Sequence, residues 1–100
     1  MTVWFVSRHP GAAQWAQRQG LDVDRQVEHL DIEQVAFGDT VIGTLPVHLA
    51  EALCRRGAWY CHVVLHIPPE HRGRELTADE MEAMDARLAY YQVEQIEPER

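Results

Sequence analysis

The most constraining feature of the sequence is a short strand that runs through a Gly-Thr turn into a helix. Thr40–Ile42 is a run of β-branched residues, which predicts a buried strand. Gly43 ends this strand, Thr44 can cap a helix, and a helix is expected over Pro46–Arg56. Unpaired N–H groups and the helix dipole point outward at such a junction, so it is suited to bind an anion. An ordinary strand-to-helix turn is the alternative.

A second junction of the same kind lies at the N-terminus. Val3–Val6 predicts a buried strand, and a helical pattern follows over Ala12–Gln19. Between them stand Ser7, Arg8 and His9, which supply a hydroxyl, a guanidinium and an imidazole. Ligands of open α/β sheets bind outside the carboxyl ends of the strands, where the strand order reverses. The two junctions are therefore expected to meet at one site.

The rest of the chain continues this alternation within one domain, residues 1–100. A weak strand at Gln26–Leu30, a helical turn at Asp31–Val35 and a strand at Ala58–Ile67 are expected, followed by a polar loop at 70–76. The capping box Thr77–Glu80 then opens a helix that has Met81, Met84 and Leu88 on one side. An edge strand at Tyr90–Ile96 and a frayed tail are expected at the C-terminus. The pattern β-α-β-β-α-β-α-β predicts a three-layer α/β domain with a mostly parallel sheet of about five strands.

Charge and composition exclude several classes of function. The formal net charge of −7 argues against a protein that binds long nucleic acid, which would need a basic face. All nine basic residues are Arg, which suits bidentate phosphate recognition or reflects genome composition. No apolar run reaches the length of a membrane span, and Cys54 and Cys61 are too few for a disulfide framework. We therefore expect a soluble, cytoplasmic protein that does not bind membranes.

Three stretches taken together resemble a family of small CRISPR-associated proteins found with type III systems. They are Met1–Gly11, Gly38–Pro46 and Arg72–Leu76, and the resemblance spans nearly the whole chain. It implies a Rossmann-like (CARF-like) domain, akin to the CRISPR-associated sensor domains for cyclic oligoadenylates. It also implies a homodimer. Several proteins of this group are ring nucleases that open cyclic tetra-adenylate and so switch off the antiviral signal.

The residues of the first junction suit the chemistry of such a nuclease. Opening a cyclic 3′-5′ adenylate ring needs no added nucleophile, because a ribose 2′-OH can attack the adjacent phosphate. The protein must hold the reacting atoms in line and stabilise charge on the phosphoryl oxygens, which requires neither a metal nor a cofactor. We expect Arg8 to clamp the phosphate, Ser7 to orient its oxygens, and His9 to transfer a proton. A surface imidazole beside a proline is the alternative for His9.

Further ligand contacts are expected from both junctions and from the polar loop. The candidate residues are Pro10, Gly11, Gly43, Thr44, Leu45, Arg72 and Arg74. The loop that carries the two arginines could close over a ligand, or it could be a solvated turn. A metal site at His62, His66 and His71 is disfavoured, because no carboxylate or thiol stands at a clear ligand spacing. Asp39 precedes its strand and is expected at the opposite end, in a turn or a cap.

Three functions remain open. A ring nuclease is favoured by the resemblance and by the hydroxyl, guanidinium and imidazole at the predicted switch point. A sensor or sponge that binds the same messenger without cleavage is the second. An interaction subunit of a CRISPR complex, with no nucleotide site, is the third.

Overall fold

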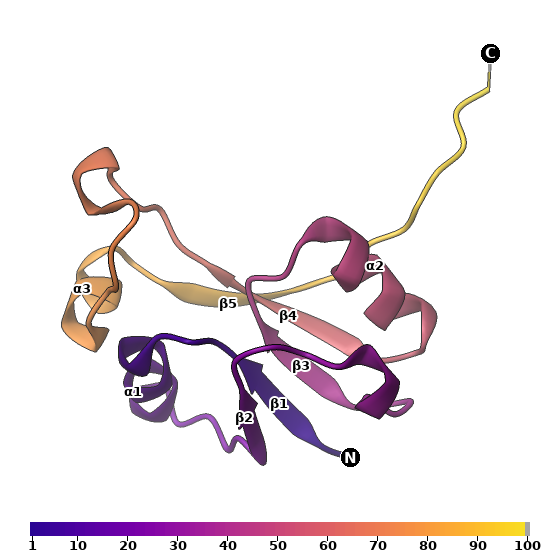
Figure 1. The fold of residues 1–100 in the computed structure, drawn as a ribbon, viewed down its shortest axis with the longest axis horizontal. Helices are drawn as coiled ribbons and strands as arrows, with labels where there is room; N and C mark the ends of the chain where they lie inside the picture. Colours follow the sequence, from indigo (N-terminus) through magenta and orange to yellow (C-terminus); the bar gives the residue numbers. More distant parts are fainter. Residues whose placement is uncertain (100) are drawn as a thin grey trace.

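The computed structural model describes residues 1–99 as a five-stranded sheet with helices on both faces (Figure 1). The elements in chain order are β1 (Val3–Val6), α1 (Pro10–Arg18), β2 (Arg25–Val27), the 3-10 helix η1 (Ile32–Gln34), β3 (Thr40–Gly43), α2 (Val47–Arg55), β4 (Trp59–Val64), the 3-10 helix η2 (Pro69–His71), α3 (Ala78–Ala83) and β5 (Arg87–Tyr91). The strand order is β2-β1-β3-β4-β5, with β5 antiparallel to β4 and all other pairs parallel. The predicted mixed α/β class and mostly parallel sheet are confirmed.

The sheet is covered on both faces, so its central strands are buried on both sides. Trp4 and Phe5 of β1 point to opposite faces, and each side chain is 2% exposed. Phe5 packs in the core beneath α1 and α3, whereas Trp4 packs in the core beneath α2 and η1. Continuous apolar runs rather than alternating ones are typical of such strands. None of the described helices is both long enough and apolar enough to cross a membrane.

Two local predictions about helical segments are confirmed. The expected turn after β2 is η1, and the Asp31 carboxylate accepts a hydrogen bond from the Glu33 N–H there (3.1 Å). The capping box opens α3: the Thr77 hydroxyl accepts from the Glu80 N–H (3.1 Å), and the Glu80 carboxylate accepts from the Thr77 N–H (3.0 Å).

The prediction that Leu88 belongs to the third helix is wrong. α3 ends at Ala83, and Asp85 adopts a left-handed φ of 57°. The Ala86 N–H donates to the Met81 carbonyl (3.0 Å), which is one of the two hydrogen bonds of a Schellman motif. Glycine usually occupies the left-handed position of this motif, and an aspartate occupies it here. The helix predicted from the sequence pattern is therefore too long at its C-terminal end, and Leu88 lies in β5.

Three strands differ in their bounds from the prediction. β2 begins and ends earlier than Gln26–Leu30, because Leu30 leaves the sheet and packs with the core beneath α2. β4 ends at Val64, because this residue lies opposite Arg87, where the antiparallel β5 begins to pair with it. β5 begins and ends earlier than the predicted Tyr90–Ile96 strand and shares only Tyr90 and Tyr91 with it. Residues 92–99 form no regular element; Val93 packs against the core beneath α2, and the chain then extends away from the sheet (Figure 1).

Asp39 joins the chain segments at the amino ends of β1 and β3, opposite the candidate site, as the sequence predicted. Its carboxylate is 4% exposed and accepts hydrogen bonds from the Thr2 N–H (2.9 Å), the Ala36 N–H (3.0 Å) and the Trp4 indole (3.1 Å). The bond from Thr2 is the largest cause that lowers the pKa of Asp39 below its ordinary value. The role of Asp39 is therefore to hold a turn.

We expect Asp39→Asn to lower the free energy of unfolding by about 1–3 kcal/mol at pH 7, because buried donors lose a charged acceptor. A folded-state pKa below the ordinary value of about 4 means that the stabilisation is present above that pH. It is lost as the pH falls through the folded-state pKa. The difference from wild type should therefore shrink in acid. Urea denaturation at several pH values measures it, with the exposed Asp22→Asn as control; equal loss in both variants would contradict this role.

Candidate functional site

The strand order changes direction between β1 and β3, and polar residues follow both strands at that point. The two strands pair in parallel with Val6 opposite Gly43, so Ser7 and Thr44 leave the sheet side by side. The chain crosses from β1 toward β2 but from β3 toward β4, so the two connections diverge. Ligands in open α/β sheets bind in the crevice formed at such a switch point.

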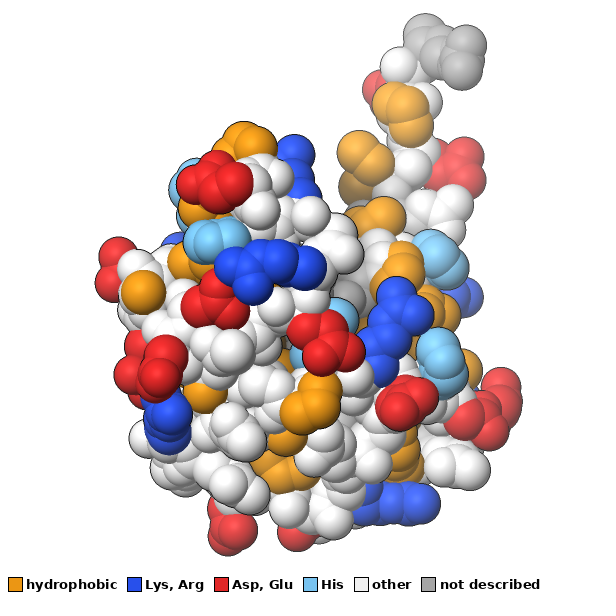
Figure 2. All heavy atoms as spheres, turned by 60° about the vertical axis from the view of Figure 1, so that its left-hand side comes forward, with side chains coloured by type: hydrophobic (Ala, Val, Ile, Leu, Met, Phe, Trp, Pro, Cys, Tyr) orange, Lys and Arg blue, Asp and Glu red, His pale blue; other side chains and the backbone are white. Residues whose placement is uncertain are grey.

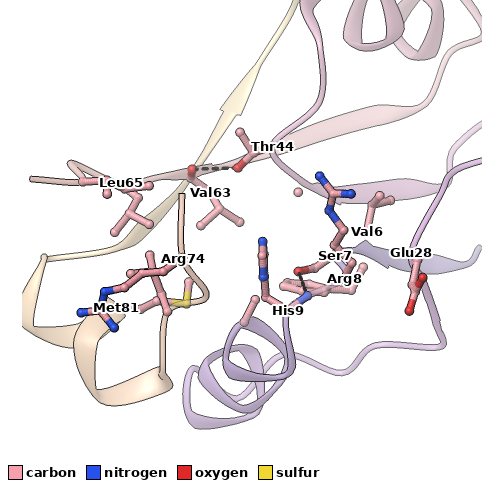
Figure 3. Close-up of a pocket in the computed structure, with 15 residues that line it drawn as sticks. Val6, Ser7, Arg8, His9, Glu28, Thr44, Val63, Leu65, Arg74 and Met81 are labelled. Carbon is pink, nitrogen blue, oxygen red and sulfur yellow. Dashed lines mark hydrogen bonds between the residues drawn. The ribbon is translucent and has the colours of Figure 1, made fainter. Parts of the chain in front are cut away.

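A cavity of about 360 Å³ lies at this edge of the sheet (Figure 3). Its polar lining consists of Ser7, Arg8, His9, Glu28, Thr44 and Arg74. Its other lining residues are Phe5, Val6, Ala12, Gly43, Val63, Leu65, Ile67, Leu76 and Met81. The volume falls in the lower part of the range for small-molecule sites. The two junctions meet here, as the sequence predicted.

Arg8 and His9 are free to contact a ligand. Both residues are exposed, and Arg8 forms no ion pair with any residue of the described chain, 1–99. Figure 3 shows Arg8 reaching toward the Thr44 side of the cavity, with the His9 ring pointing into its centre. The His9 N–H donates to the Ser7 hydroxyl oxygen (3.1 Å), so the serine also shapes the turn that carries the other two residues.

The turn between β3 and α2 is fixed from behind by Tyr60 of β4. The Leu45 N–H donates to the Tyr60 hydroxyl (3.0 Å), which lies 3.3 Å from the Gly43 carbonyl oxygen and 2.5 Å from Nδ1 of His62. Tyr60 is 4% exposed, and this burial raises its pKa. The Leu45 N–H is therefore occupied within the protein.

Thr44 does not cap α2, so the prediction of a threonine cap is wrong. Pro46 is the N-cap residue and makes no side-chain hydrogen bond to the helix. The Thr44 hydroxyl instead donates to the Val63 carbonyl (3.4 Å), which ties the turn to β4. The residue is still exposed at the cavity.

Four of the predicted ligand-binding residues lie outside the cavity lining: Pro10, Gly11, Leu45 and Arg72. Gly11 has a packing role, because a Cβ atom there would lie 2.0 Å from the Leu76 carbonyl oxygen. Pro10 occupies the first position of α1, where its missing N–H is tolerated. Arg74 lines the cavity, but its guanidinium is bonded to Glu80.

The sequence interpretation missed Glu28 and the apolar wall of the cavity. Glu28 directly follows β2, just as Ser7 and Thr44 directly follow β1 and β3. With the correct bounds for β2, the sequence would therefore have predicted Glu28 at the same edge of the sheet. Leu65 and Ile67 were assigned to a strand, whereas they follow β4 and face the cavity. In Figure 3, Leu65 and Met81 lie across the cavity from Arg8.

Charges of both signs are mixed on this end of the molecule. Figure 2 brings the side of α1 and α3 forward and shows Arg and His side chains interspersed with Asp and Glu side chains. No group of three or more His, Cys, Asp and Glu side chains among residues 1–99 is arranged to hold a metal ion. Of the three histidines weighed as ligands, His62 is bonded to Tyr60, and Nε2 of His71 lies 3.7 Å from the Glu80 carboxylate.

Residues 4–94 match the family described as "Putative CRISPR-associated protein (Cas_VVA1548)". The chain belongs to this CRISPR-associated family. The matched region contains both junctions and every residue that lines the cavity. No curated protein and no solved structure matches the chain significantly. The family match associates the chain with CRISPR, and the residues that line the cavity are the basis for proposing its chemistry.

We expect Tyr60→Phe to reduce the free energy of unfolding by about 1–3 kcal/mol, because the Leu45 N–H loses its acceptor. The matched control is Tyr90→Phe, since the Tyr90 side chain is 66% exposed. Denaturant unfolding of both variants measures the difference. A loss of the same size in both would show that the Tyr60 hydroxyl does not hold the turn.

Proposed function

We propose that this CRISPR-associated protein is a ring nuclease that binds a cyclic oligoadenylate, with cyclic tetra-adenylate as its ring, and cleaves it by attack of a ribose 2′-OH. Cleavage would switch off type III CRISPR signalling in the cytoplasm. One observation carries the proposal: Arg8, which forms no ion pair within residues 1–99, and the exposed His9 reach a cavity at the switch point, beside Ser7 and Thr44. Membership of a CRISPR-associated family supports the setting.

The polar side of the cavity suits the phosphate. Arg8 can bind two phosphoryl oxygens through its planar guanidinium and stabilise charge that develops on them. His9 can remove the proton of the attacking 2′-OH or supply one to the leaving 5′-oxygen. Ser7 and Thr44 can orient phosphate oxygens from the two strand ends. The protein contributes position and charge, and the substrate contributes the nucleophile.

The apolar side of the cavity suits an adenine base. Val63, Leu65, Ile67 and Met81 form a wall across from the polar residues. A cavity of about 360 Å³ fits one nucleotide unit better than a ring of four. A homodimer in a Rossmann-like arrangement, with two cavities related by a two-fold axis, would present matching sites to one ring.

Binding without cleavage is the second candidate function. It is favoured by His9, whose ring has no hydrogen-bond partner to orient it among residues 1–99. A sponge or sensor needs affinity but no oriented proton donor. The products distinguish the two functions.

We expect Arg8→Ala to abolish turnover of cyclic tetra-adenylate and to weaken its binding by about 1.5–3 kcal/mol, because one charge-assisted phosphate contact is lost. Arg55→Ala is the matched control, since Arg55 lies on α2 outside the cavity and pairs with Glu51. Turnover and Kd are measured in the presence of a chelator. Wild-type turnover in a folded Arg8→Ala protein would place the site elsewhere.

We expect His9→Ala to lower kcat by roughly 10²–10⁴-fold with little change in Kd, because a general acid or base acts mainly on the chemical step. Thr44→Val should weaken binding and turnover together, since its contact is made before and during the reaction. Mass spectrometry of early products should show a 2′,3′-cyclic phosphate. A first product with a 5′-phosphate and a 3′-hydroxyl would rule out this mechanism, and binding with no product would establish the second candidate.

A further inference from the structure

The ion pairs that join the segment at the rim of the cavity to α3, among residues 1–99, converge on one carboxylate, that of Glu80. We call residues 68–76 the rim segment; it contains η2 and carries Arg74 and Leu76 of the cavity lining. Nη2 of Arg74 lies 2.5 Å from Oε2 of Glu80, and Nε2 of His71 lies 3.7 Å from the same oxygen. Figure 3 shows the Arg74 side chain along the cavity wall, with its guanidinium turned away from His9.

Glu80 is the fixed member of this contact. Its Oε1 accepts the Thr77 N–H (3.0 Å), so the capping box holds the side chain on α3. α3 is held in turn against α1, through Met81 in the shared core and through the ion pair of Arg18 with Asp79 (2.6 Å). Hydrogen bonding from Thr77, with a smaller effect of Arg74, lowers the pKa of Glu80, so the carboxylate is charged at neutral pH.

Arg74 is the movable member. It follows Gly73, which adopts a φ of 82° in open space, and its side chain is 49% exposed. The rim segment has only one short 3-10 helix and forms no strand pairing. Because exposed ion pairs are weak, a better anion can displace the carboxylate from Arg74 without unfolding α3.

We propose that Glu80 is a built-in competitor for Arg74, which keeps the guanidinium out of the cavity until an anionic ligand replaces the carboxylate. The inference rests on the proposed function only in taking the ligand to carry phosphate. On binding, Arg74 exchanges the Glu80 carboxylate for phosphoryl oxygens opposite Arg8, and the rim segment follows it over the cavity. Removal of the competitor should therefore loosen the free rim segment and tighten binding.

The test compares Glu80→Gln with Glu82→Gln. The glutamine at position 80 keeps an oxygen for the Thr77 N–H, whereas it loses the charge that holds Arg74. Glu82 lies on the same helix and pairs with Arg18 (3.3 Å), so its variant removes the same charge away from the rim segment. Amide hydrogen exchange of the ligand-free proteins should be about two- to fivefold faster over residues 70–76 in Glu80→Gln, and unchanged in Glu82→Gln.

Binding of labelled cyclic tetra-adenylate provides the second measurement. Glu80→Gln should bind about two- to fivefold more tightly than Glu82→Gln, and adding Arg74→Gln to both should remove this difference. Glu80→Gln could loosen α3 itself, because Glu80 belongs to the capping box. Arg74→Gln alone leaves the capping box intact, and it should still speed amide exchange over residues 70–76.

The outcomes separate this inference from the proposed function. Unchanged exchange over residues 70–76 and unchanged affinity in Glu80→Gln would overturn the inference, even where the wild-type protein cleaves the ring. Weaker binding in Glu80→Gln than in Glu82→Gln, with α3 intact, would overturn it as well. Faster exchange in the rim segment with no ring binding by any variant would support the hold of Glu80 on Arg74 and overturn the proposed function.

Discussion

The site depends on the parallel pairing of β1 with β3. Val6 and Gly43 lie opposite each other, and this register brings Ser7 and Thr44 to the same edge of the sheet. Gly43 makes the close approach possible, because a Cβ atom there would lie 2.9 Å from the Val6 carbonyl oxygen. A shift of register would separate the arginine and imidazole of one turn from the hydroxyl of the other, and no cavity with both would form.

The polar groups at the amino ends and at the carboxyl ends of the parallel strands have different partners. At the amino ends, Asp39 accepts hydrogen bonds from three donors on two chain segments and contributes stability. At the carboxyl ends, Arg8 is left without a partner in the described chain, and the polar groups face a cavity. The Asp39 hydrogen bonds therefore stabilise the end of the sheet away from the candidate site. Tyr60, behind the β3–α2 turn, and the Val63 carbonyl, which accepts from Thr44, connect β4 to the shape of the candidate site.

Much of the fold could be predicted, because the signals are local. The β-branched run at Thr40–Ile42 and the capping box at Thr77–Glu80 both depend on neighbouring residues, and both predictions are confirmed. The end of α3 could not be predicted, because Asp85 adopts a left-handed conformation that usually marks glycine. The end of β4 depends on where β5 begins to pair with it, which is a long-range property.

The candidate site, like the fold, could be predicted only in part from the sequence. The meeting of the two junctions was predictable from strand topology, as was the presence of Arg8 and His9 at the strand end. The partners of individual groups were not, because Thr44 bonds to the Val63 carbonyl and Leu45 to Tyr60, both from β4. Such contacts depend on side-chain packing between strands distant in the sequence. The roles of the cavity residues remain predictions.

The proposed function requires that the edge between β1 and β3 binds a cyclic oligoadenylate. A titration of isotope-labelled protein with cyclic tetra-adenylate, followed by amide chemical shifts, tests it directly. We expect the largest shift changes at residues 7–9, 43–44 and 74–76, with little change around Asp39 at the opposite end of the sheet. Saturable changes confined to the opposite end, or no change at ligand concentrations well above those of the protein, would contradict binding at this edge.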